Sequence, residues 1–356
     1  MDPAPCKRKR SDSEAEAAEK AALQPSPGVR LMLRSSVWYD DGNIIVQAET
    51  TRFRVYGGAL AFHSPVLKAI VDSLDENSPT ADGCRIVHVS DAALDVEEVL
   101  KKLFHQCYSD NDPLSFHTIA AFARIGRSWE IPSLFENAVL RLSSVFPSNH
   151  EMITRSNNGR YVSVSPEKWF DLLYGTIALA HELDIPILLP AAFLFLCSSD
   201  AIANALPFIP IADAQAILFS FNWFQKGWAD FVYEWFDGDF AECTGREMCR
   251  FEKHMRRKSL CSTKPLCSEN IFMYNPQWAA GLCRPCAIEG RRRHAELGKA
   301  MWTNIPAAFG LPSWTSMLKG SSVQACSITT ATREVSAEAS RAGSMETQPA
   351  LSERRP

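Results

Sequence analysis

Four cysteines in the C-terminal half of the sequence have the spacing of metal ligands. Cys283 and Cys286 form a C-x-x-C pair at the entry to a predicted helix, and Cys243 and Cys249 form a second pair upstream. Two sulfurs from a short turn and two from a distant pair can complete the tetrahedral shell of a zinc ion. The pattern therefore predicts one structural zinc ion bound by these four cysteines.

Two alternatives to this site stay open. Cys243 and Cys249 are further apart than the usual spacing of about two to four residues, and Cys261 and Cys267 repeat the same wider spacing. The chain has 11 cysteines, and cysteine is also a common buried apolar residue. Ordinary reduced thiols are thus the alternative to a zinc site, and Cys261 with Cys267 are the alternative to the upstream pair.

The sequence shows no pattern that indicates catalysis. The signatures of a serine-nucleophile elbow, a phosphate-binding loop, a dinucleotide-binding loop and a zinc protease are all missing from it. His181 is followed by Ile185 and Pro186, which end a predicted helix, so we assign no catalytic role to it. We therefore expect a protein that is not an enzyme.

Basic residues gather around the cysteines and near the N-terminus. Those around the cysteines could contact nucleic-acid phosphates, but charge runs are more often solvated helix faces, and no recognised DNA-binding spacing is present. Nucleic-acid binding is therefore the alternative function and not the expected one. The residues are Arg246, Arg250, Lys253, Arg256, Arg257, Lys258, Arg291, Arg292 and Arg293. The N-terminal run, which is either a nuclear-localisation patch or a solubilising tail, consists of Lys7, Arg8, Lys9 and Arg10.

Length and composition indicate two folded units between polar tails. The chain of 356 residues is 46% hydrophobic, and its net charge of -4 gives no overall attraction to nucleic acid or membranes. No uninterrupted apolar run is long enough to span a bilayer, and the N-terminus lacks a secretory apolar segment. We therefore expect an intracellular protein of the nucleus or cytoplasm, without a membrane partner.

Composition also predicts the domain boundaries. Residues 1–28 and 319–356 are poor in aromatic side chains and rich in small and charged ones, so we expect disordered tails there. A polar insert over residues 149–160 is the clearest internal break. The expected domains are residues 29–148 and 160–318.

The first expected domain mixes strands and helices. Apolar residues flank the polar stretch 49–51 and predict a β-hairpin, while Ser64 and Pro65 are typical of a helix start. Asp95 and Glu98 form a capping-box pattern for a helix over residues 96–108. A strand over 85–89 and helices over 115–128 and 133–145 complete this domain.

The second expected domain is mainly α-helical. An aromatic run at helical spacing predicts a buried stripe more simply than a ligand groove. Its members are Phe221, Phe224, Trp228, Phe231 and Trp235. Residues 123–140 and 177–194 resemble each other, because each places a turn ending in Ile-Pro between two helices. The whole chain is therefore expected to be α+β.

Separated segments of the sequence resemble a BTB/POZ domain, in the form found in basidiomycete (mushroom-forming) fungi. They are residues 37–47, 53–55, 60–67, 87–91 and 95–100. The C-terminal marks shared with those fungal proteins are Cys243, Cys249, residues 282–286, Trp302, residues 305–306 and 309–312, and Trp314. The resemblance implies an N-terminal domain with a small sheet flanked by helices.

The resemblance also implies a role in protein interaction. BTB/POZ domains form homodimers or dock partners such as corepressors and cullin-type ubiquitin ligases, and the interface candidates here are Trp38, Asp41, Tyr56 and Gly57. Asp41 matches the acidic residue of the family's charged pocket, but Tyr56 and Gly57 stand where many members have His followed by Lys or Arg. We therefore expect a homodimeric adaptor that does not use the charged-pocket mode of binding.

Overall fold

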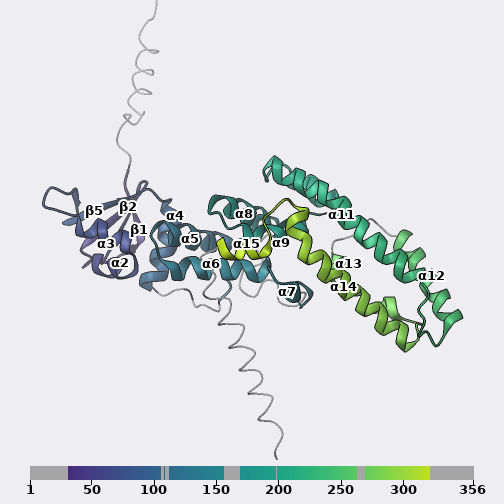
Figure 1. Cartoon of the computed structure of the whole chain (residues 1–356). Helices are drawn as coiled ribbons and strands as arrows, with labels where there is room; N and C mark the ends of the chain where they lie inside the picture. Colours follow the sequence, from purple (N-terminus) through teal and green to yellow (C-terminus); the bar gives the residue numbers. More distant parts are fainter. Residues whose placement is uncertain are drawn as a thin grey trace, which may run out of the picture. The chain divides into compact units, whose positions relative to one another are not determined.

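The computed structural model of the chain describes residues 31–105, 108, 112–155, 169–197, 199–262 and 269–320 (Figure 1). Contacts between Cα atoms divide it into two compact units, the first ending at Glu97 and the second beginning at Glu98. The fold is α+β as predicted, with a small sheet in the first unit and helices in the second. The predicted N-terminal tail and nearly all of the predicted C-terminal tail lie outside the described residues.

The first unit is built on a five-stranded mixed sheet. Its strands are β1 (Leu33–Trp38), β2 (Ile44–Ala48), β3 (Thr51–Val55), β4 (Thr80–Ala81) and β5 (Cys84–Val89). They lie in the order β1-β3-β2-β5-β4, so β1 and β4 are the edges. β2 and β3 form the predicted antiparallel hairpin, while β1 runs parallel to β3 and β5 runs parallel to β2. The hairpin and the strand predicted over 85–89 are both confirmed.

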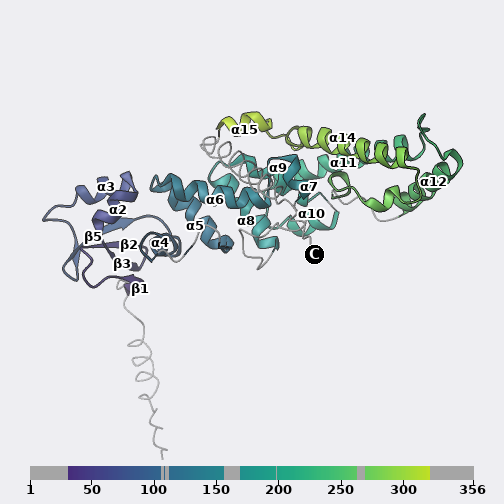
Figure 2. The ribbon, with the colours of Figure 1, turned by 90° about the horizontal axis from the view of Figure 1, so that it is seen from below.

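Helices α2 (Gly57–His63) and α3 (Pro65–Asp72) pack on one face of this sheet (Figure 2). The side-chain oxygen of Ser64 accepts a hydrogen bond from the backbone N–H of Leu67 at 3.0 Å, which confirms the predicted helix start. A Cβ atom at Gly57 would lie 3.2 Å from Cγ2 of Ile44, so glycine lets α2 approach the sheet closely. Phe53 and Leu60 are fully buried in the core between the helices and the sheet.

Helix α4 (Ala93–Leu100) corrects one prediction. Asp95 does not cap a helix over 96–108, because α4 begins earlier and places Asp95 in its first turn. The carboxylate of Glu49, in the turn of the hairpin, accepts a hydrogen bond from the backbone N–H of Ala93 at 3.3 Å. A residue remote in sequence thus caps the helix, and the local pattern could not show it. A π-helical segment, Lys101–His105, follows.

The second unit consists of helices. They are α5 (Phe116–Ser128), α6 (Pro132–Val145), α7 (His150–Arg155), α8 (Trp169–Glu182), α9 (Leu189–Phe195), α10 (Ser199–Ala205), α11 (Ile211–Phe236), α12 (Arg246–Ser262), α13 (Glu269–Phe272), α14 (Arg284–Ala308) and α15 (Trp314–Gly320). The predicted helices α5 and α6 are confirmed. Both helices belong to the second unit, because α5 packs on α8. The first unit therefore ends at Glu97, earlier than the predicted first domain over residues 29–148. The domain boundary over residues 149–160 stays a prediction.

The two similar segments of the sequence share their backbone geometry. Glu130 after α5 and Asp184 after α8 both have a positive φ, of 52° and 48°. In each case the next residue donates its N–H to the carbonyl five positions earlier, from Ile131 to Gly126 and from Ile185 to Ala180, both at 2.8 Å. This is the Schellman end of a helix. The similarity is therefore a repeated way of ending one helix and starting the next.

Helices α11 and α14 lie side by side (Figures 1 and 2). Four of the five residues of the predicted aromatic stripe, Phe224, Trp228, Phe231 and Trp235 of α11, are buried and belong to the core. The fifth, Phe221, is only half-buried. A Cβ atom at Gly290 of α14 would lie 2.8 Å from the ring of Trp235, so glycine is needed for the close approach.

A buried histidine of α14 adds to this core. His294 is only 3% exposed and lies against the rings of Trp228, Phe231, Tyr274 and Trp278, at centroid distances of 5.3 to 6.3 Å. These aromatic contacts fix the position of α14 along α11, and so also fix where α14 begins.

The positive φ of Glu130 generates a stability prediction. Glu130→Gly should raise the free energy of unfolding by about 0.5–1 kcal/mol, because glycine adopts the left-handed conformation without the steric cost of a Cβ atom. Chemical denaturation followed by circular dichroism measures the change. Glu130→Ala is the control and should not stabilise, and an equal gain in both variants would contradict the conformational explanation.

Candidate metal centre

Two helix starts position the four cysteines. Cys243 lies in the loop before α12 and Cys249 in the first turn of that helix. Cys283 is the N-cap residue of α14, in an extended conformation, and Cys286 lies in its first turn, with Pro285 between them. Proline suits the first turn because its missing N–H has no partner in the helix there. Each helix thus supplies one sulfur from just before or at its start and one from its first turn.

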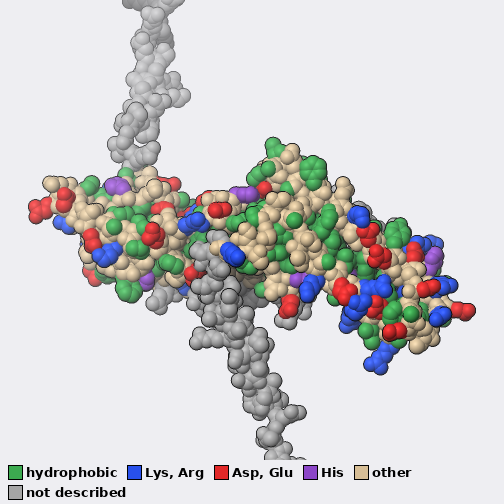
Figure 3. Space-filling view, viewed as in Figure 1, with side chains coloured by type: hydrophobic (Ala, Val, Ile, Leu, Met, Phe, Trp, Pro, Cys, Tyr) green, Lys and Arg blue, Asp and Glu red, His purple; other side chains and the backbone are tan. Residues whose placement is uncertain are grey.

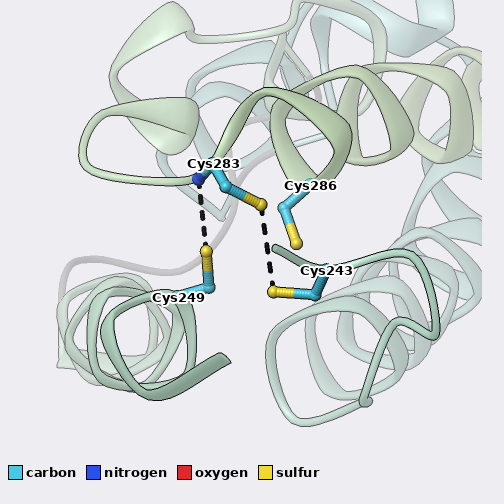
Figure 4. Close-up of side chains that lie close together, drawn as sticks. All are labelled: Cys243, Cys249, Cys283 and Cys286. Carbon is cyan, nitrogen blue, oxygen red and sulfur yellow. Dashed lines mark hydrogen bonds between the residues drawn. The ribbon is translucent and has the colours of Figure 1, made fainter. Parts of the chain in front are cut away.

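The four sulfur atoms converge on one point (Figure 4). All of them lie within 4.8 Å of one another, and Sγ of Cys243 is 3.8 Å from Sγ of Cys283. Tetrahedral zinc with Zn–S bonds of about 2.3 Å holds its sulfurs about 3.8 Å apart. The backbone N–H of Cys283 donates to Sγ of Cys249 at 3.2 Å, a bond that orients a ligand. The residues therefore fit a tetrathiolate zinc ion.

The thiols differ in burial and in pKa. Cys249 and Cys286 are buried, and Cys243 and Cys283 are half-buried. Burial raises the pKa of Cys249 and of Cys286, and neighbouring thiols raise the pKa of Cys286 further. Burial also acts to raise the pKa of Cys283, but hydrogen bonds from the backbone N–H of Cys286 and from Thr244 lower it to about 5. Four thiolates this close repel one another, so full deprotonation requires a bound cation.

The structure brings the predicted upstream pair, Cys243 and Cys249, to Cys283 and Cys286. Of the alternative pair, Cys261 ends α12 with a side chain outside the described residues, and Cys267 lies wholly outside them. Cys84 and Cys197 are buried elsewhere as free thiols. The spacing alone did not decide between the two upstream pairs, because the chain between residues 243 and 283 can fold back in several ways.

Two of the interface candidates in the first unit contact each other. The hydroxyl of Tyr56 donates to Oδ1 of Asp41 at 2.6 Å, and this hydrogen bond raises the pKa of Tyr56. The carboxylate of Asp41 is thus hydrogen-bonded by the phenol of Tyr56. The backbone N–H of Gly57 donates to Oδ1 of Asn43 at 2.8 Å. Trp38 lies apart from them on the other face of the sheet, where the guanidinium of Arg34 stacks on its ring at 4.1 Å.

Acidic neighbours pair with much of the basic group around the cysteines. Arg250 bonds Asp239 at 3.0 Å, and Arg257 bonds Asp237 at 2.6 Å. Further ion pairs join Arg256 to Glu252, Arg292 to Glu289 and Glu296, and Arg293 to Glu289. Figure 3 shows acidic and basic side chains intermixed over this end of the second unit. The pattern favours a solvated, ion-paired surface. The N-terminal run Lys7 to Arg10 lies outside the described residues.

Two polar side chains, His181 and Lys253, have surroundings that no sequence pattern indicates. Nε2 of His181 lies 2.7 Å from Oδ2 of Asp213, which joins α8 to α11. Lys253, counted among the surface charges, is in fact only 4% exposed. Asp213 and Gly238, which these two side chains contact, lie far from them in the sequence, so no local pattern could indicate the contacts.

Among the helices that the structure describes, none combines the length and the apolar character needed to cross a bilayer.

Comparison of the sequence with protein-family models and with curated proteins, and of the structure with solved structures, gave no match.

The geometry predicts one zinc ion per chain. Cys286→Ser should weaken zinc binding about 70- to 900-fold, because one of four ligands contributes about a quarter of the roughly 10–16 kcal/mol typical of structural zinc. Elemental analysis of purified protein and competition with a chelator measure content and affinity. Cys197→Ala and Cys261→Ser are controls that should keep the metal. A wild-type chain that takes up no zinc would refute the site.

Proposed function

We propose that this protein is a non-enzymatic adaptor, in which a BTB/POZ-like first unit self-associates or recruits protein partners and a helical second unit is held by one structural zinc ion. The observation that carries the proposal is the set of four converging cysteine sulfurs.

The donor set favours a structural metal over a catalytic one. Catalytic zinc sites keep one position for water or substrate, whereas four protein ligands fill the tetrahedral shell. Cys243, Cys249, Cys283 and Cys286 would take all four positions. The ion would then link the starts of α12 and α14 and stabilise the fold, and its loss would lower stability instead of stopping a reaction. This argues for a protein whose surfaces, and not a reaction centre, carry the function.

The first unit offers an edge for self-association. Strand β1 lies at the edge of the sheet, and the apolar residues at its start, Leu31, Met32 and Leu33, are 82%, 41% and 58% exposed. An edge strand presents unpaired backbone groups, and exposed apolar side chains beside it favour pairing with another chain. These features support a homodimer built through β1.

The Tyr56–Asp41 hydrogen bond bears on the mode of partner binding. In the charged pocket of the BTB/POZ family a basic residue lies beside the acidic one, and here the phenol of Tyr56 binds Asp41 instead. A neutral donor provides no positive charge for a partner's acidic group. We therefore propose partner binding through the edge of the sheet and not through this pocket, with corepressors and cullin-type scaffolds as the classes of partner to examine.

Nucleic-acid binding has less support. The arginines near the cysteines are largely bonded to carboxylates of the same unit, and each such bond would have to break or be shared before the guanidinium could contact a phosphate. The interaction role remains the better supported of the two.

Oligomeric state tests the proposal. The wild-type chain should be a dimer in light scattering coupled to size exclusion, and Leu31→Asp with Leu33→Asp should weaken the dimer at least tenfold, because buried carboxylates at the interface would lose hydration. Leu206→Asp, at a site 53% exposed in the second unit, is the matched control. A wild-type monomer at tens of micromolar would contradict self-association.

A further inference from the structure

Lys253 on α12 is the one buried lysine in the part of the chain that the structure describes, with 4% of its surface exposed. Lysine is almost never fully buried unless an opposite charge accompanies it, because removing an ammonium group from water costs several kcal/mol or more. A negative charge is therefore expected near the ammonium group of Lys253.

The direct contacts of Lys253 do not include a negative charge. Its Nζ donates to the carbonyl oxygen of Gly238 at 3.1 Å and lies 3.6 Å from the ring centre of Trp235. No carboxylate lies within ion-pair distance of this Nζ among the residues described. The carbonyl dipole and the aromatic face offset part of the desolvation, but neither carries a negative charge.

The cysteine cluster lies on the same cavity as Lys253. Lys253 lines this cavity of about 260 Å³ together with Cys243, Cys249 and Cys286. Asp237 and Asp239 line it as well, and they bond Arg257 and Arg250. Burial lowers the pKa of Lys253, and the charges of the same three cysteines act in the opposite direction. Of the other cations nearby, Arg250 bonds Asp239 and Arg293 bonds Glu289, whereas Arg246, on the same cavity, is exposed to solvent.

We propose that Lys253 is the counter-charge of the metal centre: its buried ammonium offsets the net negative charge of a divalent cation held by four cysteine sulfurs and so raises the affinity for that cation. The inference rests on the proposed zinc site. A zinc ion with four thiolates carries a net charge of about −2. A fixed ammonium ion beside it in a partly dry cavity lowers the cost of that charge, as groups beyond the ligands do in other metal sites.

This role also explains the position of α12. With metal bound, Lys253 and the tetrathiolate neutralise each other in part. Without metal, the ammonium stays buried against Trp235 and the charge of the bound centre is missing. Metal binding and the packing of α12 are therefore linked through one side chain.

The test compares zinc affinity with stability of the metal-free protein. Lys253→Met keeps the apolar stem and removes the charge, so it should weaken zinc binding about 10- to 100-fold in chelator competition. The same variant should leave the unfolding midpoint of the metal-free full chain unchanged or higher, because an uncompensated buried charge is removed. Lys253→Arg should retain most of the affinity. Arg246→Met, which alters an exposed cation on the same cavity, should change affinity less than about threefold.

The outcomes separate the two proposals. A wild-type chain that binds no zinc overturns the metal site itself. A wild-type chain that binds zinc, with Lys253→Met equal to it in affinity, overturns only the role of Lys253. A Lys253→Met variant that loses metal-free stability together with affinity, or fails to fold, shows a packing role and also overturns the inference. Loss of affinity with unchanged or raised metal-free stability supports it.

Discussion

The four converging cysteine sulfurs join the start of helix α12 to the start of α14, and the packing of α12 depends on them. The reason is that α12 turns mostly polar side chains toward the rest of the second unit. Over residues 246–260 of this helix, where the side chains are described, Cys249 and Lys253 are buried, whereas Met248, Phe251 and Met255 are 60%, 59% and 46% exposed. A surface helix is normally held by an apolar face turned inward. Here apolar burial contributes little, so a metal ion linking α12 to α14 would supply much of what fixes the helix.

The convergence of four cysteine sulfurs also accounts for the positive charges around them. Thiolates can gather only if positive charge accompanies them, and a bound metal ion would supply the largest part of it. In the proposed centre Lys253 would supply a fixed part from inside the protein, while Arg250 and Arg257 pair with Asp239 and Asp237. The basic residues therefore differ by location: buried Lys253 would stabilise the proposed metal centre, whereas Arg250 and Arg257 form ion pairs at the surface.

The two units depend on different kinds of interaction. In the first, alternating apolar residues, a tight hairpin and the Ser64 cap build the sheet and its covering helices through local signals and a common core. In the second, the aromatic stripe of α11 and the enclosed His294 align α14, and the alignment brings Cys283 and Cys286 to the start of α12. A closed donor set and an exposed sheet edge both fit a protein that acts through its surfaces.

The features that depend on neighbours in the chain could be predicted from the sequence. They are the hairpin, the helix start at Ser64, most of the buried stripe on α11 and the C-x-x-C pair at the start of α14, because periodicity, caps and short turns are local. Three features required the folded chain: which upstream cysteines meet that pair, the capping of α4 by Glu49 instead of Asp95, and the burial of Lys253. Each of these depends on segments distant in the chain that packing brings together, and a linear pattern carries no information on that proximity.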